Sequence, residues 1–278
     1  MKEISGYTRL VGLIANPIKH SLSPKMHNEA FEKLGLDYVY LAFEVEKEGL
    51  KNAIGSIRVL DMLGSNISMP YKEEVIKYLD ELSPEAKLIG AVNTIVNDKG
   101  KLIGHITDGI GFMKSLRSEG IDPTGKKIVI VGAGGAATAI TVQAALDKTE
   151  QIDIFNVKDE YFDKAIGNAK LVNERTECKA TAYDLDDIDV LKEKMEQADI
   201  FINATGVGMK PLENESVIKD SALLREDLVV CDVVYYPKET LLIKMAKEKG
   251  CKVVYGSGMM LYQGAYAFEL WTGKEMPI

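Results

Sequence analysis

Short apolar runs alternate with amphipathic stretches along the whole chain, and no internal repeat or low-complexity segment is visible. In the first third, the apolar runs predict strands over residues 10–15, 38–45, 63–68, 90–96 and 102–106. Helical spacing predicts helices over residues 24–34, 46–57 and 71–79. After a polar turn at 118–127, strands are expected over residues 128–131, 152–155, 179–183, 200–203, 228–234 and 253–255, with a last helix over about 259–271. This alternation is typical of an α/β protein.

The helix expected over residues 24–34 has the best-marked ends. Ser23 is the expected N-cap, Pro24 stands at the first helical position and Gly35 follows the last turn. One face, at helical spacing, carries the side chains expected to be buried: His27, Ala30, Phe31 and Leu34.

Composition limits the classes of function. A length of 278 residues suggests two domains, and 34 Lys and Arg against 42 Asp and Glu give a formal net charge of −8. A chain this acidic is not expected to present a broad basic face for nucleic acid. The three histidines and the three cysteines, which form no CxxC pair, predict neither a metal site nor a disulfide framework. Neither a membrane helix nor the apolar core of a signal peptide is found, so we expect a cytoplasmic protein.

A glycine-rich loop follows the strand expected over residues 128–131 and precedes a helix of small residues. Gly132 allows the tight turn, Gly134 lets a phosphate approach the backbone, and Ala137 permits close packing of helix on sheet. The helix N-terminus then offers N–H groups and a positive dipole to a pyrophosphate. A turn without a ligand or a methyltransferase loop has a similar pattern. The flanking strands and helix favour a dinucleotide.

The type of dinucleotide depends on the end of the next strand, where an acidic residue favours NAD and an Arg favours NADP. Asn156 is neutral, Lys158 could meet a phosphate and Asp159 could meet ribose hydroxyls. These residues leave the choice between NAD and NADP open.

Four polar clusters stand at expected strand ends in the first third of the chain, at residues 16–24, 64–72, 90–94 and 104–109. Taken singly, each has a plain structural explanation as a helix cap, a turn or a solvated lysine. Together they indicate a site, because the carboxyl ends of parallel strands meet at one edge of a sheet. Ser21 and Ser23 suit a carboxylate, the Ser, Asn and Thr side chains suit a polyol, and Lys72 with Asp108 suits proton transfer.

A series of motifs in the same order resembles the shikimate dehydrogenase family across nearly the whole chain. They are GLIANPIKHSLSP at 12–24, NISMPYK at 66–72, GAVNT at 90–94, TDG at 107–109, VGAGGA at 131–136, NATGVGM at 203–209, DVVYYP at 232–237 and GMMLYQGA at 258–265. The segment 207–216 favours the quinate/shikimate dehydrogenase branch. The resemblance implies the reversible, NAD(P)H-dependent reduction of 3-dehydroshikimate to shikimate in aromatic amino-acid biosynthesis, and it leaves quinate open as a second substrate.

The resemblance also implies two domains with a cleft between them. Residues 1–108 and 259–278 would form a mostly parallel α/β substrate-binding catalytic domain, and residues 109–258 a Rossmann NAD(P)-binding domain. The expected partner is a small-molecule substrate, without nucleic acid, membrane or metal, and a homodimer is left open.

The family's site residues carry over by position. Lys72 would be the catalytic acid/base, paired with Asp108, and Ser21 and Ser23 would bind the substrate carboxylate. The rest of the substrate would meet Ser68, Asn93, Asp108, Tyr235 and Gln263. The cofactor would contact Gly132, Ala133, Gly134, Gly135, Ala136, Asn156, Lys158, Asp159, Thr205, Gly206, Val233, Gly256 and Met260.

Three residues depart from the family pattern. Ser68 stands where Thr is usual and keeps the hydroxyl, and Ile106 stands where Asn is usual. Val157 stands where an Arg usually clasps the adenosine 2′-phosphate, so we expect NAD to be used as well as NADP. Two other functions stay open on the sequence. One is another dehydrogenase of the same two-domain plan, such as a folate dehydrogenase or a glutamyl-tRNA reductase. The other is a regulator that binds a nucleotide without turnover.

Overall fold

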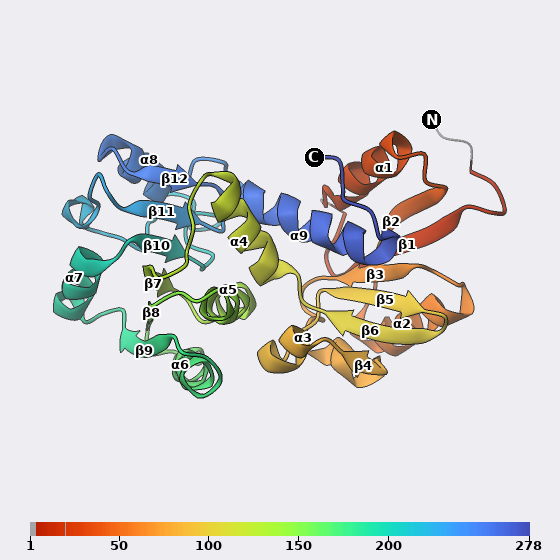
Figure 1. The fold of residues 1–278 in the computed structure, drawn as a ribbon, viewed down its shortest axis with the longest axis horizontal. Helices are drawn as coiled ribbons and strands as arrows, with labels where there is room; N and C mark the ends of the chain where they lie inside the picture. Colours follow the sequence, from red (N-terminus) through yellow and green to blue (C-terminus); the bar gives the residue numbers. More distant parts are fainter. Residues whose placement is uncertain (1–3, 20) are drawn as a thin grey trace. The chain divides into compact units, whose positions relative to one another are not determined.

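The computed structural model describes residues 4–19 and 21–278 and divides them into two units (Figure 1). The first unit contains the described residues up to Thr107 together with Gln263–Ile278, and the second is Asp108–Tyr262. Each unit contains one six-stranded sheet flanked by helices. The α/β class expected from the alternating pattern is therefore confirmed.

The sheet of the first unit has the strand order β2-β1-β3-β5-β6-β4. Its strands are β1 (Arg9–Ala15), β2 (Tyr38–Glu44), β3 (Gly64–Ile67), β4 (Glu81–Leu82), β5 (Thr94–Asp98) and β6 (Lys101–His105). β1 pairs in parallel with β2 and β3, whereas β5 is antiparallel to β3 and forms a hairpin with β6. As a result, the carboxyl ends of β1, β3 and β6 lie at the same edge of the sheet as the amino end of β5.

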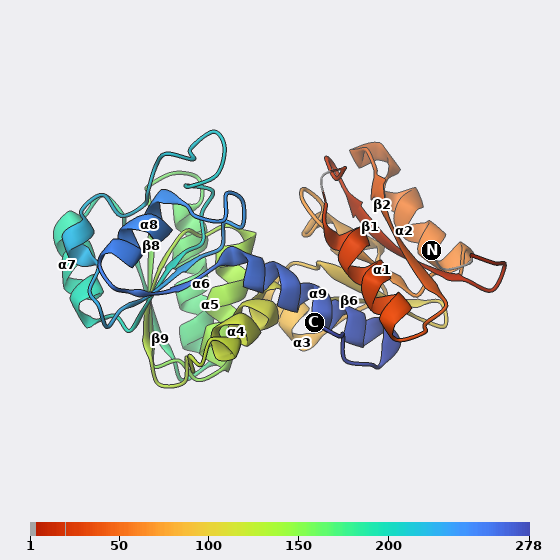
Figure 2. The ribbon, with the colours of Figure 1, turned by 90° about the horizontal axis from the view of Figure 1, so that it is seen from above.

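Helices cover both faces of this sheet. They are α1 (Ser23–Lys33), α2 (Leu50–Val59), α3 (Pro84–Ile89) and the second half of α9 (Gly256–Thr272), with 3-10 turns at Lys47–Gly49 and Glu74–Tyr78. α1 and α2 lie on opposite sides of β1 and β2 (Figure 2). Phe31 of α1, Tyr40 of β2 and Phe268 of α9 belong to one apolar core on the α1 side.

The end of α9 makes a close contact with the middle of the sheet. The indole Nε1 of Trp271 donates a hydrogen bond to the carbonyl oxygen of Ile95 at 2.9 Å. Gly64 of β3 lies beside this bond: a Cβ there would stand 2.0 Å from the Ile95 oxygen and 2.6 Å from the indole nitrogen. The contact therefore requires glycine at this position.

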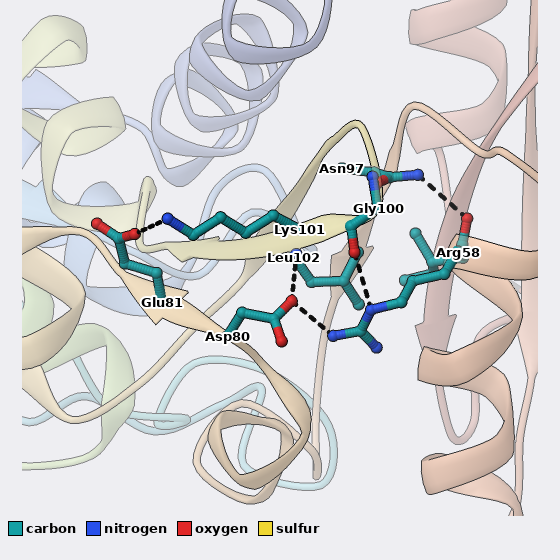
Figure 3. Close-up of polar contacts among 8 residues, drawn as sticks. Arg58, Asp80, Glu81, Asn97, Gly100, Lys101 and Leu102 are labelled. Atoms are coloured by element: carbon teal, nitrogen blue, oxygen red, sulfur yellow. Dashed lines mark hydrogen bonds and ion pairs between the residues drawn. The ribbon is translucent and has the colours of Figure 1, made fainter.

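The turn of the β5–β6 hairpin is held by polar contacts of side chains and backbone groups. We call the residues that make them the charged clamp: Arg58, Asp80, Glu81, Asn97, Gly100, Lys101 and Leu102 (Figure 3). Arg58 of α2 donates from Nη2 to Asp80 Oδ2 at 2.7 Å and from Nε to the Gly100 carbonyl oxygen at 3.0 Å. Asp80 Oδ2 also accepts the Leu102 N–H at 2.7 Å. Lys101 forms an ion pair with the carboxylate at the start of β4. The clamp thus ties the hairpin turn to α2 and β4.

The sheet of the second unit has the order β12-β11-β10-β7-β8-β9, with every neighbouring pair parallel. Its strands are β7 (Lys127–Val131), β8 (Gln151–Asn156), β9 (Lys179–Asp184), β10 (Ile200–Asn203), β11 (Val229–Asp232) and β12 (Lys252–Val254). This is the doubly wound Rossmann order, which binds ligands at the switch point between its first and fourth strands, here β7 and β10.

This second sheet is buried on both faces. Its helices are α4 (Asp108–Ser118), α5 (Gly135–Leu146), α6 (Phe162–Arg175), α7 (Ile188–Gln197) and α8 (Leu241–Glu248), with a 3-10 turn at Ser221–Leu223. Figure 2 shows α5 and α6 on one side of the sheet and α7 and α8 on the other. Along β7, Ile128 and Ile130 join the core under α5 and α6, and Val129 and Val131 join the core under α7 and α8. Burial on both faces explains why this strand has an unbroken apolar run.

Three elements differ from those expected. The strand expected over residues 90–96 begins only at Thr94, because the preceding segment is α3, with Ser83 as its N-cap and Gly90 as its left-handed C-cap (φ 72°). The helix expected over residues 71–79 is the 3-10 turn Glu74–Tyr78, so Lys72 lies in a turn before it. α4 was not expected, since its glycines lower helix propensity.

Gly109 explains why α4 tolerates glycine. A Cβ at Gly109 would stand 2.3 Å from the Ala139 carbonyl oxygen of α5, so only glycine allows the two helices to approach this closely.

The expected N-cap of α1 is also wrong. Ser23 is the first residue of the helix, Leu22 occupies the N-cap position, and no side-chain cap bond is made there. Instead, the Ser21 hydroxyl oxygen accepts the Ser23 N–H at 3.2 Å. A serine therefore does satisfy this helix end, but it comes from two residues earlier in the chain.

In the part of the chain that the structure describes, no three His, Cys, Asp or Glu side chains are grouped so as to hold a metal ion. Cys178, Cys231 and Cys251 are free thiols and all are buried. Among residues 4–19 and 21–278, no helix combines the length and apolar character that crossing a membrane requires.

Candidate active site

Polar side chains gather at the edge of the first sheet where β1, β3 and β6 end and β5 begins. The Ile67 N–H donates to the Asn93 carbonyl oxygen at 2.8 Å, and the Asn93 N–H donates to the His105 carbonyl oxygen at 3.0 Å. The Val92 N–H donates to the Lys72 carbonyl oxygen at 2.8 Å. These bonds bring three of the predicted polar clusters together. Asn93 was expected inside a strand over residues 90–96, but it directly precedes β5, whose amino end lies at this edge because β5 is antiparallel to β3.

Five side chains at this edge form what we call the amide network: Asn66, Asn93, Thr94, Thr107 and Gln263. Asn93 Oδ1 accepts the Thr107 N–H at 2.9 Å, and Asn93 Nδ2 donates to Gln263 Oε1 at 3.3 Å. Asn66 Nδ2 donates to the Asn93 carbonyl oxygen at 3.1 Å and to Thr94 Oγ1 at 3.0 Å. All but Gln263 are buried. The network is neutral, so its burial requires hydrogen-bond partners but no counter-charge.

The two serines predicted to bind a carboxylate lie at the start of α1 and are half-buried. Besides its backbone bond to Ser21, Ser23 has its side chain beside the Tyr40 hydroxyl. The Tyr40 hydroxyl donates to Asn66 Oδ1 at 2.7 Å. Tyr40 therefore joins the serine turn to the amide network.

Ser68 and Lys72 occupy the segment that follows β3. Both are half-buried. The Ser68 N–H donates to the Ile14 carbonyl oxygen at 3.0 Å, so this segment stays fixed to the end of β1. Together with the bond from Val92, this anchors the backbone of Lys72 beside the amide network.

Asp108 is the first residue of α4 and begins the second unit. It is 6% exposed and directly follows Thr107 of the amide network. A carboxylate in the first turn of a helix is stabilised by the helix dipole. The dipole therefore favours an acid at this position.

The glycine loop lies at the switch point of the second sheet. Gly132 has φ 115°, and a Cβ there would stand 2.8 Å from the Ala204 carbonyl oxygen, so glycine is required. Cβ atoms at Gly134 and Gly135 would meet nothing within 4 Å. Gly134 is the N-cap of α5 and provides no side-chain bond to its first turn. The residues present therefore fit a pyrophosphate at the helix N-terminus.

The loops after β10 and β11 are shaped by two buried side chains, Asn203 and Asp232. Asn203 Oδ1 accepts the Thr205 hydroxyl at 2.7 Å, and the Asn203 carbonyl oxygen accepts the Val233 N–H at 3.0 Å. Asn203 Nδ2 donates to Asp232 Oδ1 at 3.0 Å. Burial raises the pKa of Asp232 to about 6. The same set of hydrogen bonds therefore holds both loops that carry the predicted cofactor residues Thr205, Gly206 and Val233.

The end of β8 carries three of the predicted cofactor residues. Asn156 Nδ2 donates to Asp159 Oδ1 at 2.8 Å, and Lys158 Nζ lies 3.0 Å from Asp184 Oδ2 of β9. Val157 between them is 39% exposed. The cation that we expected to meet a phosphate is therefore already paired with a carboxylate.

The other predicted residues lie in the second unit near β11 and α9. Tyr235 is 46% exposed and follows the Val233 loop by two residues. Gly256 begins α9, and a Cβ there would stand 2.4 Å from the Val233 carbonyl oxygen, so glycine allows α9 to start against this loop. Met260 lies one turn further along α9 and is half-buried.

Tyr40, Asn203 and Asp232 were not predicted to belong to the site. Tyr40 stands in an apolar strand and gives no sign of its hydroxyl partner, which lies 26 residues away. Asn203 and Asp232 are polar residues that end apolar strands. That signal was visible in the sequence and could have found them.

Two family models match the chain. Residues 13–95 match the shikimate dehydrogenase substrate binding domain, and residues 256–278 match the shikimate 5'-dehydrogenase C-terminal domain. A curated shikimate dehydrogenase (NADP(+)) of Listeria monocytogenes serotype 4b is 54% identical over 277 residues, which cover 100% of this chain and 95% of that protein.

Solved structures are similar over the same length. Shikimate 5-dehydrogenase from Listeria monocytogenes, in complex with shikimate and NAD, has a TM-score of 0.97 and 55% identity, with 100% of this chain and 96% of that chain covered. Quinate dehydrogenase from Corynebacterium glutamicum, in complex with NAD, has a TM-score of 0.87 and 32% identity, with 97% of this chain and 95% of that chain covered. The similarity therefore spans both units.

Proposed function

The chain belongs to the shikimate dehydrogenase family, and we propose that it reduces 3-dehydroshikimate reversibly to shikimate, with Lys72 and Asp108 acting at the reacting carbonyl. It is an oxidoreductase that uses NAD or NADP, with a role in aromatic amino-acid biosynthesis. The observation that carries the residue assignment is the amide network, in which Asn93 and Gln263 share a hydrogen bond beside the anchored backbone of Lys72.

The chemistry of the first unit suits a hydroxylated ring acid. Ser21 and Ser23 offer hydroxyls and a helix N-terminus to the carboxylate. Ser68, Asn93 and Gln263 offer neutral donors and acceptors to the ring hydroxyls. Tyr235 completes the substrate contacts by family position. Residues 1–108 and 259–278 are then the catalytic domain.

Lys72 holds the proton that the reaction needs. The nicotinamide supplies the hydride when bound. Lys72, as an ammonium, donates a proton to the substrate oxygen as that oxygen gains negative charge, and the amine takes the proton back in the oxidation direction. Asp108 accepts a hydrogen bond at this site and keeps the lysine oriented.

The second unit fits the dinucleotide, and residues 109–258 are its binding domain in this proposal. The pyrophosphate lies at the loop formed by Gly132, Ala133, Gly134, Gly135 and Ala136. Asn156 and Asp159 meet the adenosine ribose. The supported loops of Thr205, Gly206 and Val233 line the site, together with Gly256 and Met260.

Replacement of Lys72 tests the assignment. In Lys72→Met we expect kcat to fall by about 10²–10⁴-fold, because the proton donor is lost while the apolar stem is kept. Lys77→Met is the matched control, because Lys77 lies in the neighbouring 3-10 turn, is exposed and forms an ion pair with Glu74. A kcat of Lys72→Met within threefold of that control would remove Lys72 from the reaction.

Quinate is a second candidate substrate. The motif segment 207–216 favours it, and the quinate dehydrogenase of Corynebacterium glutamicum shares 32% identity with this chain. Initial rates with shikimate or quinate, each with NAD or NADP, decide this point. Nucleotide binding without turnover in all four assays would support the regulator alternative instead.

We infer that 2′-phosphate recognition is weak, because Val157 supplies no cation and Lys158 is paired with Asp184. In Val157→Arg we expect the NADP to NAD ratio of kcat/KM to rise about tenfold, and the Kd for NADP+ to fall in calorimetry. Asp184→Asn should release Lys158 and move the ratio about threefold in the same direction. Unchanged Kd values for NADP+ and NAD+ in both variants would contradict the inference.

We assign the reaction to the cytoplasm. All three cysteines are free and buried, which suits a reducing compartment.

A further inference from the structure

Two fully buried rings lie behind the proposed substrate site, and no assigned role includes them. His27 of α1 and Tyr40 of β2 are stacked, with centroids 4.4 Å apart and an interplanar angle of 15°. Both have 0% exposure. Neither nitrogen of His27 has a hydrogen-bond partner among the described residues. The imidazole therefore acts here as a flat, neutral ring.

Tyr40 is also fixed through its backbone. β2 is the outer strand of its sheet, and its free edge faces α1 at this point. Asn28 of α1 donates from Nδ2 to the Tyr40 carbonyl oxygen at 2.9 Å and accepts the Tyr40 N–H at Oδ1 at 2.8 Å. Successive residues of one helix thus hold the ring and the backbone of Tyr40.

Because the ring is fixed, the Tyr40 hydroxyl is held at the edge of the amide network. There it donates to Asn66 Oδ1 at 2.7 Å, and the Ser23 side chain lies beside the same hydroxyl. Ser23 belongs to the proposed carboxylate site, whereas Asn66 holds the backbone of Asn93, which belongs to the proposed hydroxyl site. We propose that Tyr40 is a positioning residue that sets the distance between these two halves of the substrate site, and that His27 supports its ring.

A purely structural role would not need the hydroxyl. A buried phenol is unfavourable unless its oxygen is bonded, and phenylalanine would fill the same volume without that requirement. The hydrogen bond of this oxygen leads to Asn66 at the site edge, and Ser23, which also influences this hydroxyl, belongs to the same edge. This distribution indicates that the hydroxyl serves the site. The inference rests on the proposed function.

Tyr40→Phe is the decisive variant, because it removes one oxygen and keeps the stack on His27. We expect KM for shikimate to rise about tenfold with kcat changed less than threefold. Displaced side chains at the site would weaken binding of the substrate and of the transition state to the same extent. Tyr38→Phe is the matched control: Tyr38 lies on the same strand, is half-buried, and packs its ring edge-on against Phe31 at 5.5 Å.

Two further measurements separate positioning from general damage. The Kd for NADP+ of Tyr40→Phe should stay within twofold of the wild-type value, because the nucleotide residues lie in the second unit. His27→Phe should keep KM within about threefold by preserving a flat ring, whereas His27→Ala should raise KM about as much as Tyr40→Phe does.

The outcomes are distinct. A KM of Tyr40→Phe equal to that of Tyr38→Phe would overturn the inference and leave the proposed function intact. A rise in the Kd of Tyr40→Phe for NADP+ as large as the rise in its KM for shikimate would have the same consequence. Wild-type protein that turns over neither 3-dehydroshikimate nor shikimate would overturn the proposed function, and this inference with it.

Discussion

The β5–β6 hairpin has a polar network at each of its ends, and the two networks are of opposite kinds. At the turn, Asp98 of β5 lies opposite Lys101 of β6 in the strand register. There the charged clamp joins exposed side chains of opposite sign. At the open end, where Thr94 is paired with His105, the amide network joins buried and neutral side chains. Only the second network lies among the proposed substrate residues.

The difference follows from solvation. Exposed ion pairs lose little by separating, because water replaces the partner, so the clamp tolerates change. A buried amide that loses its partner keeps the full penalty of an unsatisfied group. The amide network therefore holds its geometry strictly, as the binding of the ring hydroxyls of the substrate requires, and the charged clamp only fixes a turn.

The largest effect is expected at the centre of the amide network. Asn93→Ala leaves the Thr107 N–H without its acceptor, so the free energy of unfolding should fall by about 2–3 kcal/mol. We also expect kcat/KM to fall by at least about 100-fold. Trp271, the one tryptophan of the sequence, lies in the first unit, so its fluorescence during urea unfolding measures this loss. An unchanged free energy of unfolding and an unchanged kcat/KM would show that the geometry of the amide network does not depend on Asn93.

A second effect concerns pH. Burial lowers the pKa of His27 from 6.5 to about 3, so the unfolded chain binds a proton that the folded chain refuses. The stability linked to His27 is complete above pH 6.5 and is lost as the pH falls from 6.5 towards 3. Between pH 7.5 and 5 the loss should be about 2 kcal/mol. His27→Phe should lack this part of the pH-dependent loss in the free energy of unfolding. An identical pH dependence in the variant and the wild-type protein would contradict the lowered pKa of His27.

The charged clamp should respond less. Asp80→Ala removes the acceptor of the Leu102 N–H and the partner of Arg58, and we expect it to lower the free energy of unfolding by about 1 kcal/mol. Activity should stay within twofold of wild type, because the clamp lies at the other end of the hairpin. A tenfold loss of kcat/KM would mean that the two ends are coupled.

The smallest effect is expected from the outer ion pair of the clamp. Lys101→Met breaks the contact with Glu81, in which both side chains are about half exposed, so the change should be below about 0.5 kcal/mol. Unfolding in high salt should reduce the difference between the two proteins further. A loss above 1 kcal/mol would place this pair in the same class as the buried network.

The sequence was sufficient for features that depend on local pattern. The alternation of apolar runs predicted the α/β class, and the glycine loop was correctly placed between a strand and a helix. Gly90 was misplaced in a strand because its left-handed conformation depends on α3, although Ser83 and Pro84 marked the start of that helix.

Features that depend on distant partners were not predictable. The position of Asn93 before an antiparallel strand, the hydroxyl bond of Tyr40 and the charged clamp all join segments that are far apart in the chain. A single sequence shows which residues are polar, but it does not show which strand runs beside which. The role assigned to Lys72 is a prediction that Lys72→Met tests, and the roles of Asp108 and the two serines stay predictions from family position.

The residues that complete the first unit are synthesised long after its sheet. Trp271 reaches the Ile95 carbonyl past Gly64, and 176 residues separate the two partners. The second unit, by contrast, is one continuous stretch, Asp108–Tyr262. The core of the first unit therefore stays incomplete until the whole second unit has been synthesised, and we expect the N-terminal strands to pack fully only when α9 is available.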